Sequence, residues 1–164
     1  MTPPRLTQPK SLDDMLLYVL WRLQATSRRP VVRLCESEFG ITRREWRMLA
    51  QLGQVEGLAS SALAERAGLD RAQTSRAVGT LVAKQLVART PRPGDRREVL
   101  LHLTEAGRAL YAKLLPRIAA INGELLSVLS DSQVALLDEV LTRLQAQADT
   151  MVRAGDQAGS ADAA

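Results

Sequence analysis

The most constraining stretch of the chain lies between Gly57 and Thr104, where a helical pattern of apolar residues gives way to an alternating one. The segment SSALAERAG predicts a short helix that ends at Gly68, and Asp70 begins a second helix, DRAQTSRAVGTLVAKQLV. Asp70 can cap this second helix, and Gln73 can reciprocate. Two helices joined by a short turn that contains glycine predict a helix-turn-helix.

A β-hairpin is predicted directly after these helices. The chain reads as a strand over 86–90, a turn over PRPGDRR and a second strand over EVLLHLT. Val99, Leu101 and Leu103 alternate with Leu100 and His102, which is typical of a strand with two different faces. The prolines and the glycine enforce the turn. A hairpin beside a helix-turn-helix is a wing, so the sequence predicts a winged helix-turn-helix that binds DNA.

The second helix of this unit offers a small, polar and basic surface. Its period places one set of residues inward, namely Thr74, Ala77, Val78, Leu81 and Leu86. The N-terminal part of such a helix contacts base edges in the major groove, where Gln pairs with adenine and Arg with guanine or phosphate. We therefore predict DNA contacts from the polar residues on the other side: Arg71, Gln73, Ser75 and Arg76.

The tip of the wing contributes four further candidates. Asp95 and Arg97 are two positions apart in an extended segment, so they lie on the same side, where the carboxylate can orient the guanidinium. An arginine at a hairpin tip suits the minor groove, where the negative potential is enhanced. Arg92 and Arg96 are predicted to contact phosphates.

The distribution of charge agrees with this interpretation. The chain has a net charge of +4, and eight basic residues against Asp70 and Asp95 lie between Arg66 and Arg97. Basic charge gathered in one short segment is typical of a nucleic-acid surface. The alternative is an ordinary solvated surface.

Helices are predicted on both sides of this lobe. Before it, a helix capped by Ser11 and Asp14 is expected to kink or break near Ser27 to Pro30 and to resume until Gly40. A capping box at Thr42–Glu45 begins a helix that Gly53 follows. After it, helices begin at Thr104 and at the Ser130–Gln133 capping box. Their apolar residues alternate in steps of three and four, as in Val134, Leu137, Leu141, Leu144, Ala148 and Met151.

That average period of 3.5 residues is how helices pair with other helices. A chain of 164 residues is too small to cover two such helices by itself, so we predict a homodimer; the alternative is that they fold back on their own chain. The predicted parts are a flexible N-terminus over 1–10, a helical dimerisation region over 11–53 and 104–153, the winged helix-turn-helix over 54–104, and a disordered tail over 154–164. The fold class is thus mainly α with a small β-hairpin wing.

Several kinds of chemistry are excluded or not predicted. A single cysteine, Cys35, and a single histidine, His102, exclude an intramolecular disulfide and a Cys/His zinc site within one chain. No catalytic cluster or phosphate-binding glycine motif is recognised, so neither an enzyme nor a metal or cofactor is predicted. No apolar run is long enough for a membrane span, and the N-terminus lacks a secretory pattern, so a cytoplasmic protein is expected.

Together these motifs resemble the MarR family of bacterial transcriptional regulators. The resemblance rests on AERAGLDRAQTSRAVGTLVAKQLVART, GDRREVLLHLTEAG and the upstream FGITRREWRMLAQLG, and extends over about 12–151. It implies a homodimer joined by its N- and C-terminal helices, in which each subunit reads half of a palindromic operator. In that resemblance Asp95 and Arg97 match the wing pair, and Gln73, Ser75 and Arg76 lie where recognition-helix contacts usually fall. Ala59 departs from the usual Thr or Ser cap.

The resemblance also implies repression that is relieved by a small molecule or an oxidant. The candidate effector pocket, suited to a small aromatic carboxylate, is lined by Trp21, Phe39, Trp46, Arg47 and Tyr111; the alternative is that these are core residues. A redox switch at Cys35 is a second hypothesis, although Glu36 and Glu38 oppose the lowered thiol pKa that it needs. A winged-helix module that binds protein is the alternative function.

Overall fold

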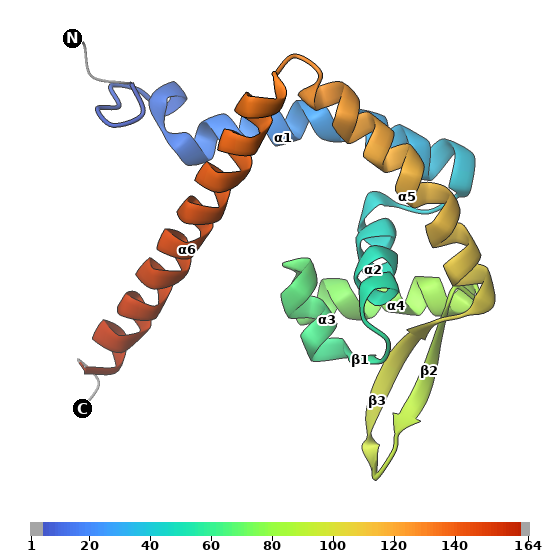
Figure 1. Cartoon of the computed structure of the whole chain (residues 1–164). Coiled ribbons are helices and arrows are strands. Elements are labelled where there is room, and N and C mark those ends of the chain that lie inside the picture. Colours follow the sequence, from blue (N-terminus) through green and yellow to red (C-terminus); the bar gives the residue numbers. More distant parts are fainter. Residues whose placement is uncertain (1–4, 162–164) are drawn as a thin grey trace. The chain divides into compact units, whose positions relative to one another are not determined.

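The computed structural model describes residues 5–161, without the side chains of 95–97 and 155–161. The chain is mainly helical with one small antiparallel sheet, and the predicted winged helix-turn-helix is confirmed (Figure 1). It divides into two compact units, Met1–Ile121 and Asn122–Ala164. In the described residues, no helix is both long enough and apolar enough to cross a lipid bilayer.

The N-terminal helix differs from its prediction at its start and at Pro30. Ser11 Oγ donates to Asp14 at 3.1 Å, but this pair belongs to the 3₁₀ turn η1 (Leu12–Asp14), and α1 (Leu16–Arg33) begins only afterwards. Of the kink or break predicted near Pro30, the break is wrong, because α1 continues through this residue. Pro30 lies on the exposed side of α1, so water can reach the carbonyl that a proline leaves without its helical partner.

A π-helical turn, η2 (Leu34–Glu38), follows α1 and ends the helix before Gly40. Gly40 has a φ of +62°, which turns the chain so that the Ile41 amide donates to the Cys35 carbonyl at 3.1 Å. This helix end, predicted at Gly40, directs the chain into α2 (Arg43–Gln54).

Helix α2 has the predicted capping box. The Thr42 amide donates to Glu45 Oε2 at 2.6 Å, and the Glu45 amide donates to Thr42 Oγ1 at 3.1 Å. Gly53, predicted to follow the helix, lies inside it. A Cβ at this position would lie 2.9 Å from the Tyr111 ring, so the glycine leaves room for the ring to pack against α2.

The hydrophobic core joins α2 to the elements that follow it, namely β1 (Leu58–Ala59), α3 (Ser60–Ala67), α4 (Arg71–Ala83), β2 (Val87–Arg92) and β3 (Asp95–Leu103). One cluster contains Leu49 of α2, Leu63 of α3, Leu81 of α4 and Leu101 of β3, each at most 2% exposed. Helix α2, which the sequence placed in the dimerisation region, therefore shares one hydrophobic core with the helix-turn-helix and the wing. We call α2, β1, α3, α4, β2 and β3 together the winged unit.

The sheet has three strands in the order β1-β3-β2, all antiparallel. Strand β1 is an addition to the predicted hairpin. The hairpin is also longer than predicted, since β2 and β3 extend into PRPGDRR until Arg92 faces Asp95, with an irregular register between Pro91 and Arg92. Only Pro93 and Gly94 remain at the tip, where Gly94 has a φ of +87° that suits glycine. On the strand face predicted to carry Val99, Leu101 and Leu103, the two leucines are buried but Val99 is 43% exposed.

Two long helices complete the chain, α5 (Glu105–Leu126) and α6 (Asp131–Ala161). The capping box predicted for α6 is present, since the Ser130 amide donates to Gln133 Oε1 at 2.9 Å and the Gln133 amide donates to Ser130 Oγ at 3.4 Å. Helix α6 continues past Arg153 to Ala161, where the sequence predicts disorder.

Candidate nucleic-acid interface

A tight turn joins α3 to α4 and sets the start of α4. Gly68 ends α3 in the left-handed region, with a φ of +60°. The Asp70 carboxylate then accepts a hydrogen bond from the Gln73 amide at 2.7 Å, which confirms the predicted N-cap. The reciprocal bond predicted for the Gln73 side chain does not occur among the described residues. The cap satisfies an amide that would otherwise lack a helical partner, so α4 has a well-defined first turn.

The two faces of α4 follow the predicted pattern except at Leu86, which lies beyond the end of α4 and is half-buried. Thr74, Ala77, Val78 and Leu81 are buried, and the Thr74 hydroxyl donates to the Asp70 carbonyl at 2.9 Å. The opposite face is exposed and carries Arg71, Ala72, Ser75, Arg76 and Gly79, while Gln73 is half-buried. Helix α4 therefore presents two arginines and a serine to solvent on a rigidly packed support.

Two side chains, Lys84 and Arg47, tie α4 and the turn before it to α2. Lys84, at the end of α4, donates through Nζ to the Gly40 carbonyl at 2.8 Å and to Glu45 Oε1 at 2.9 Å. Glu45 is 3% exposed, so this ion pair lies in a setting where water screens it little. Arg47 donates to the Ala67 carbonyl at 2.8 Å and so holds the end of α3.

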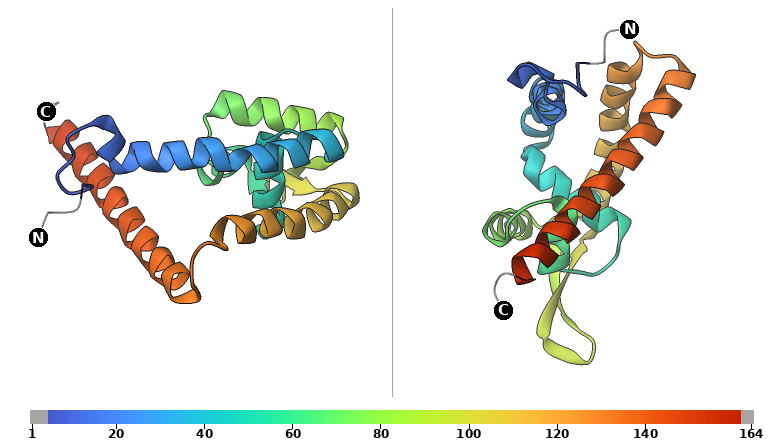
Figure 2. Two further views of the ribbon diagram at one scale, coloured as in Figure 1. Left: turned by 90° about the horizontal axis from the view of Figure 1, so that it is seen from above. Right: turned by 90° about the vertical axis from the view of Figure 1, so that its left-hand side faces the viewer.

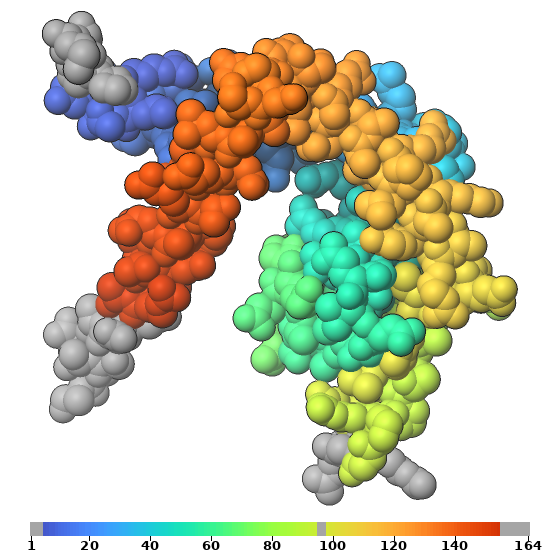
Figure 3. All heavy atoms as spheres, viewed as in Figure 1, coloured from blue at the N-terminus to red at the C-terminus, as the bar shows by residue number. Residues whose placement is uncertain are grey.

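The β2–β3 hairpin projects away from the helices of its own unit, as Figure 1, the right-hand view of Figure 2 and the space-filling view of Figure 3 show. Arg89 and Arg92 of β2 are exposed. Arg92 forms an ion pair with Glu98, which the sequence pattern does not predict. The side chains of Asp95, Arg96 and Arg97, predicted to contact DNA, lie outside the described residues.

A shallow hollow of about 220 Å³ lies between α4 and the wing, lined by Ser60, Ser75, Val78, Arg89, Val99 and Leu101. It places the start of α3, the exposed face of α4 and the two wing strands on one continuous surface. Ser60 and Arg89 are absent from the predicted contact set. Arg89 lies within the basic window of the sequence, but Ser60 carries no signal in the sequence because only the tertiary structure brings it beside Ser75.

The five predicted effector-binding residues lie in different surroundings. Trp21 is 57% exposed and stacks on Tyr18. Trp46 and Tyr111 stack on each other with ring centroids 5.8 Å apart. The guanidinium of Arg117 lies 5.6 Å from the centre of the Phe39 ring.

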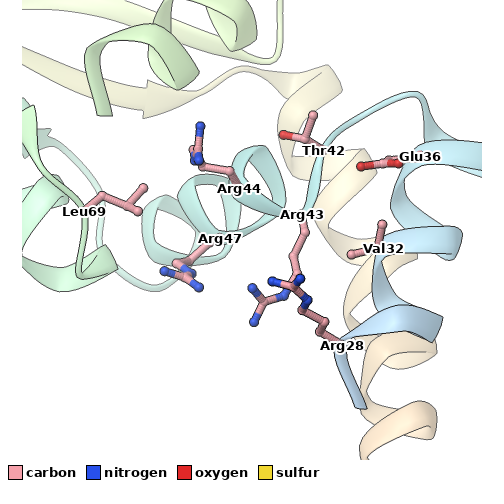
Figure 4. Close-up of a pocket in the computed structure, with 8 residues that line it drawn as sticks. All are labelled: Arg28, Val32, Glu36, Thr42, Arg43, Arg44, Arg47 and Leu69. Carbon is pink, nitrogen blue, oxygen red and sulfur yellow. The ribbon is translucent and has the colours of Figure 1, made fainter. Parts of the chain in front are cut away.

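The remaining member, Arg47, lines a separate cavity of about 370 Å³ with three other arginines, Arg28, Arg43 and Arg44 (Figure 4). The structure thus does not gather the aromatic residues around Arg47.

Cys35 is fully buried in the core. Burial, and then the nearby Glu36 charge, raise the pKa of its thiol above the ordinary value, and Arg43 opposes them only in part. A reactive thiol needs a lowered pKa and access to solvent. Cys35 has neither, so its surroundings do not favour the redox switch.

Comparison with known proteins agrees with this geometry. A model of the MarR family matches residues 39–98, which span α2, the helix-turn-helix and the start of β3. The chain is 30% identical over 137 residues to the transcriptional regulatory protein for the hcr operon of Thauera aromatica, covering 84% of this chain and 82% of that protein. It is 28% identical over 143 residues to the transcriptional repressor MdtR of Bacillus subtilis, covering 86% and 92%.

Solved structures show the same architecture. The PcaV transcriptional regulator of Streptomyces coelicolor, solved in complex with its natural ligand, superposes with a TM-score of 0.69 at 26% identity, covering 84% of this chain and 96% of that one. These relatives are transcriptional regulators rather than enzymes. The winged unit, the helices around it and the extent of these matches show that the chain belongs to the MarR family of transcriptional regulators.

Proposed function

We propose that this protein is a homodimeric repressor that binds a palindromic operator and is released from it by a small-molecule effector. The exposed face of α4 is the observation that carries the DNA-binding part of this proposal. Arg71, Ser75 and Arg76 lie on the solvent side of a helix whose other side is buried. A recognition helix presents its N-terminal residues to the major groove in this way, and Gln73 completes the proposed set.

The wing supplies the second part of the proposed reader. We assign Arg97 to the minor groove with Asp95 as its orienting carboxylate, and Arg92 and Arg96 to phosphates. Arg92 is paired with Glu98 in the free protein, so a phosphate competes with that carboxylate for it. Arg89 borders the hollow beside α4 and is a further proposed phosphate contact.

Exposed apolar side chains support the proposed homodimer. Leu17 and Trp21 of α1 are 80% and 57% exposed, and Leu141 of α6 is 43% exposed. The predicted helical pairing residues Leu137, Leu144 and Met151 are exposed as well. Burying such side chains is favourable by about 25 cal/mol per Å² of apolar surface. A dimer would place two α4 helices on half-sites about 34 Å apart.

An effector is supported by the relatives. The PcaV structure contains the natural ligand of that regulator, and small shifts at an effector site are amplified when two half-sites must be matched at once. Trp46 and Tyr111 stack on each other, so one face of each ring is already covered and is closed to a ligand. We therefore place the proposed effector pocket at the cavity that Arg47 lines.

A salt titration tests the proposed DNA binding. The measurement is the affinity for a labelled duplex containing the protein's own upstream region, between 50 and 200 mM salt. If the dimer neutralises about six phosphates, the affinity should fall roughly a thousandfold over this range. An absence of binding at 50 mM salt contradicts the proposal and favours the alternative, a winged-helix module that binds protein.

Thiol labelling tests the redox alternative. Since burial raises the pKa of Cys35, we expect the folded protein to resist alkylation at pH 7.5, whereas protein unfolded in urea reacts promptly. The extent of labelling is measured as the increase in protein mass with time. The DNA affinity of the labelled protein is then compared with that of a mock-treated sample. Rapid labelling of the folded protein together with a loss of DNA affinity would restore the redox switch.

A further inference from the structure

A cavity of about 370 Å³ lies between the second half of α1 and the first turn of α2. Its charged lining consists of four arginines, Arg28, Arg43, Arg44 and Arg47, and one carboxylate, Glu36. All of these residues belong to the first compact unit. The volume falls within the range of small-molecule sites, which is about 300–1,000 Å³.

The guanidinium groups of Arg28, Arg43 and Arg47 lie on one side of this cavity without matching carboxylates, whereas Arg44 points away from them. In Figure 4, Arg28 extends from α1 toward Arg43 of α2, and Arg47 points to the same side. Among the described residues, the side chains of Arg28, Arg43 and Arg44 form no hydrogen bond or ion pair, and Glu36 forms no ion pair with any of the four arginines. Burial, and then the charges of Arg47 and Arg28, lower the pKa of Arg43, which indicates repulsion that an anion would relieve.

The position of the cavity adds a second attraction for an anion. Thr42, Arg43 and Arg44 belong to the N-terminal turn of α2, where the helix dipole places partial positive charge. A ligand with a single charge could engage only part of this lining. Several guanidinium groups around one space suit phosphoryl or carboxylate groups, which accept paired hydrogen bonds from arginine.

The cavity also touches the part of the molecule that orients α4. Leu69, in the turn between α3 and α4, lines it. Arg47 lines it too, and the same guanidinium donates to the Ala67 carbonyl at 2.8 Å. An anion that draws Arg47 into the cavity would therefore weaken its hold on the end of α3, directly before the recognition helix.

We propose that this cavity is the effector site and that its ligand is a multivalent anion, either a phosphate ester or a compound with two or more carboxylates. This inference rests on the proposed repressor function and names the chemical class of its effector. It replaces the aromatic lining expected from the sequence with an arginine lining, and only Arg47 is common to both.

Calorimetric titration of the full-length protein tests the site, with inorganic pyrophosphate and citrate as separate probes and benzoate as the singly charged comparison. We expect at least one multivalent anion to bind at least tenfold more tightly than benzoate. The Arg28→Ala/Arg43→Ala variant should lose at least tenfold in that affinity. The matched control is Arg29→Ala/Arg33→Ala, which removes two arginines of α1 that do not line this cavity and should bind like the wild type.

A second variant keeps the test informative if the double alanine variant fails to fold. Glu36→Gln removes the only carboxylate of the lining and should tighten binding of the multivalent anion several-fold. A preference for pyrophosphate would identify a phosphate ester, and one for citrate a polycarboxylate. Equal binding by the wild type and Arg28→Ala/Arg43→Ala, unaltered binding by Glu36→Gln, or no binding of either probe would overturn the proposal.

The effector role is tested by measuring DNA affinity with and without the bound anion at matched ionic strength. The wild type should lose at least fivefold in DNA affinity, and Arg28→Ala/Arg43→Ala should not respond. Anion binding that leaves DNA affinity unchanged contradicts the effector role. A protein that binds no DNA even without anion contradicts the repressor function instead, so the two failures are distinguishable.

Discussion

Replacing Gly107 by alanine should destabilise the protein by about 2 kcal/mol or more, even though alanine is the better helix former. Gly107 lies in the first turn of α5, where it is buried against the end of the winged unit. A Cβ at this position would lie 2.0 Å from the Leu86 carbonyl oxygen. That oxygen belongs to the backbone and accepts a hydrogen bond from the Thr104 amide at 3.1 Å, so it cannot move without loss.

Equilibrium urea unfolding at one fixed protein concentration measures this effect. The matched control is Gly79→Ala in α4, where an added Cβ meets nothing within 4 Å. Because that glycine lies inside an exposed helix face, the control should gain about 1 kcal/mol. A Gly107→Ala variant as stable as the wild type would show that the first turn of α5 does not pack against the Leu86 carbonyl oxygen.

The second large effect concerns operator binding. We expect Arg71→Ala/Arg76→Ala to lower the affinity for the operator by about 2–5 kcal/mol, that is at least about thirtyfold, because each arginine contact contributes about 1–3 kcal/mol. Both side chains are exposed on the first turns of α4. Neither belongs to the core, so the thermal unfolding of the variant should match that of the wild type.

The control for this variant removes the same amount of positive charge elsewhere. Lys10→Ala/Lys113→Ala changes two exposed lysines outside the winged unit, and we expect its affinity to stay within about threefold of the wild type, since exposed charges far from the contact are screened. If both double variants lose affinity equally, net charge rather than the surface of α4 governs binding.

Much of the local structure follows from short sequence patterns. The caps at Asp70, at Thr42–Glu45 and at Ser130–Gln133 are present as predicted, because capping depends on residues only three positions apart. The inward and outward faces of α4 follow from its period for the same reason. Local patterns fail at Pro30, where helix propensity predicts a break but the exposed position permits the helix to continue.

The extent of the strands and the partition of the core could not be read from the sequence. Strand β1 consists of two residues that pair only because β3 lies beside them, and α2 joins the winged core through contacts with residues far along the chain. Long-range packing of this kind leaves no periodic signal. Sequence periodicity identifies which face of a helix is apolar, but not which other element covers it.

The winged helix-turn-helix was determined by the sequence alone, since its caps, its glycine turn and its alternating strands are all local features. Only the tertiary structure decided what surrounds Arg47. It stacked Trp46 on Tyr111 and placed Arg28 of α1 beside Arg43 of α2. The physical reason is that a cavity is made by residues distant in sequence, whose meeting depends on how whole helices pack rather than on any pattern within one of them.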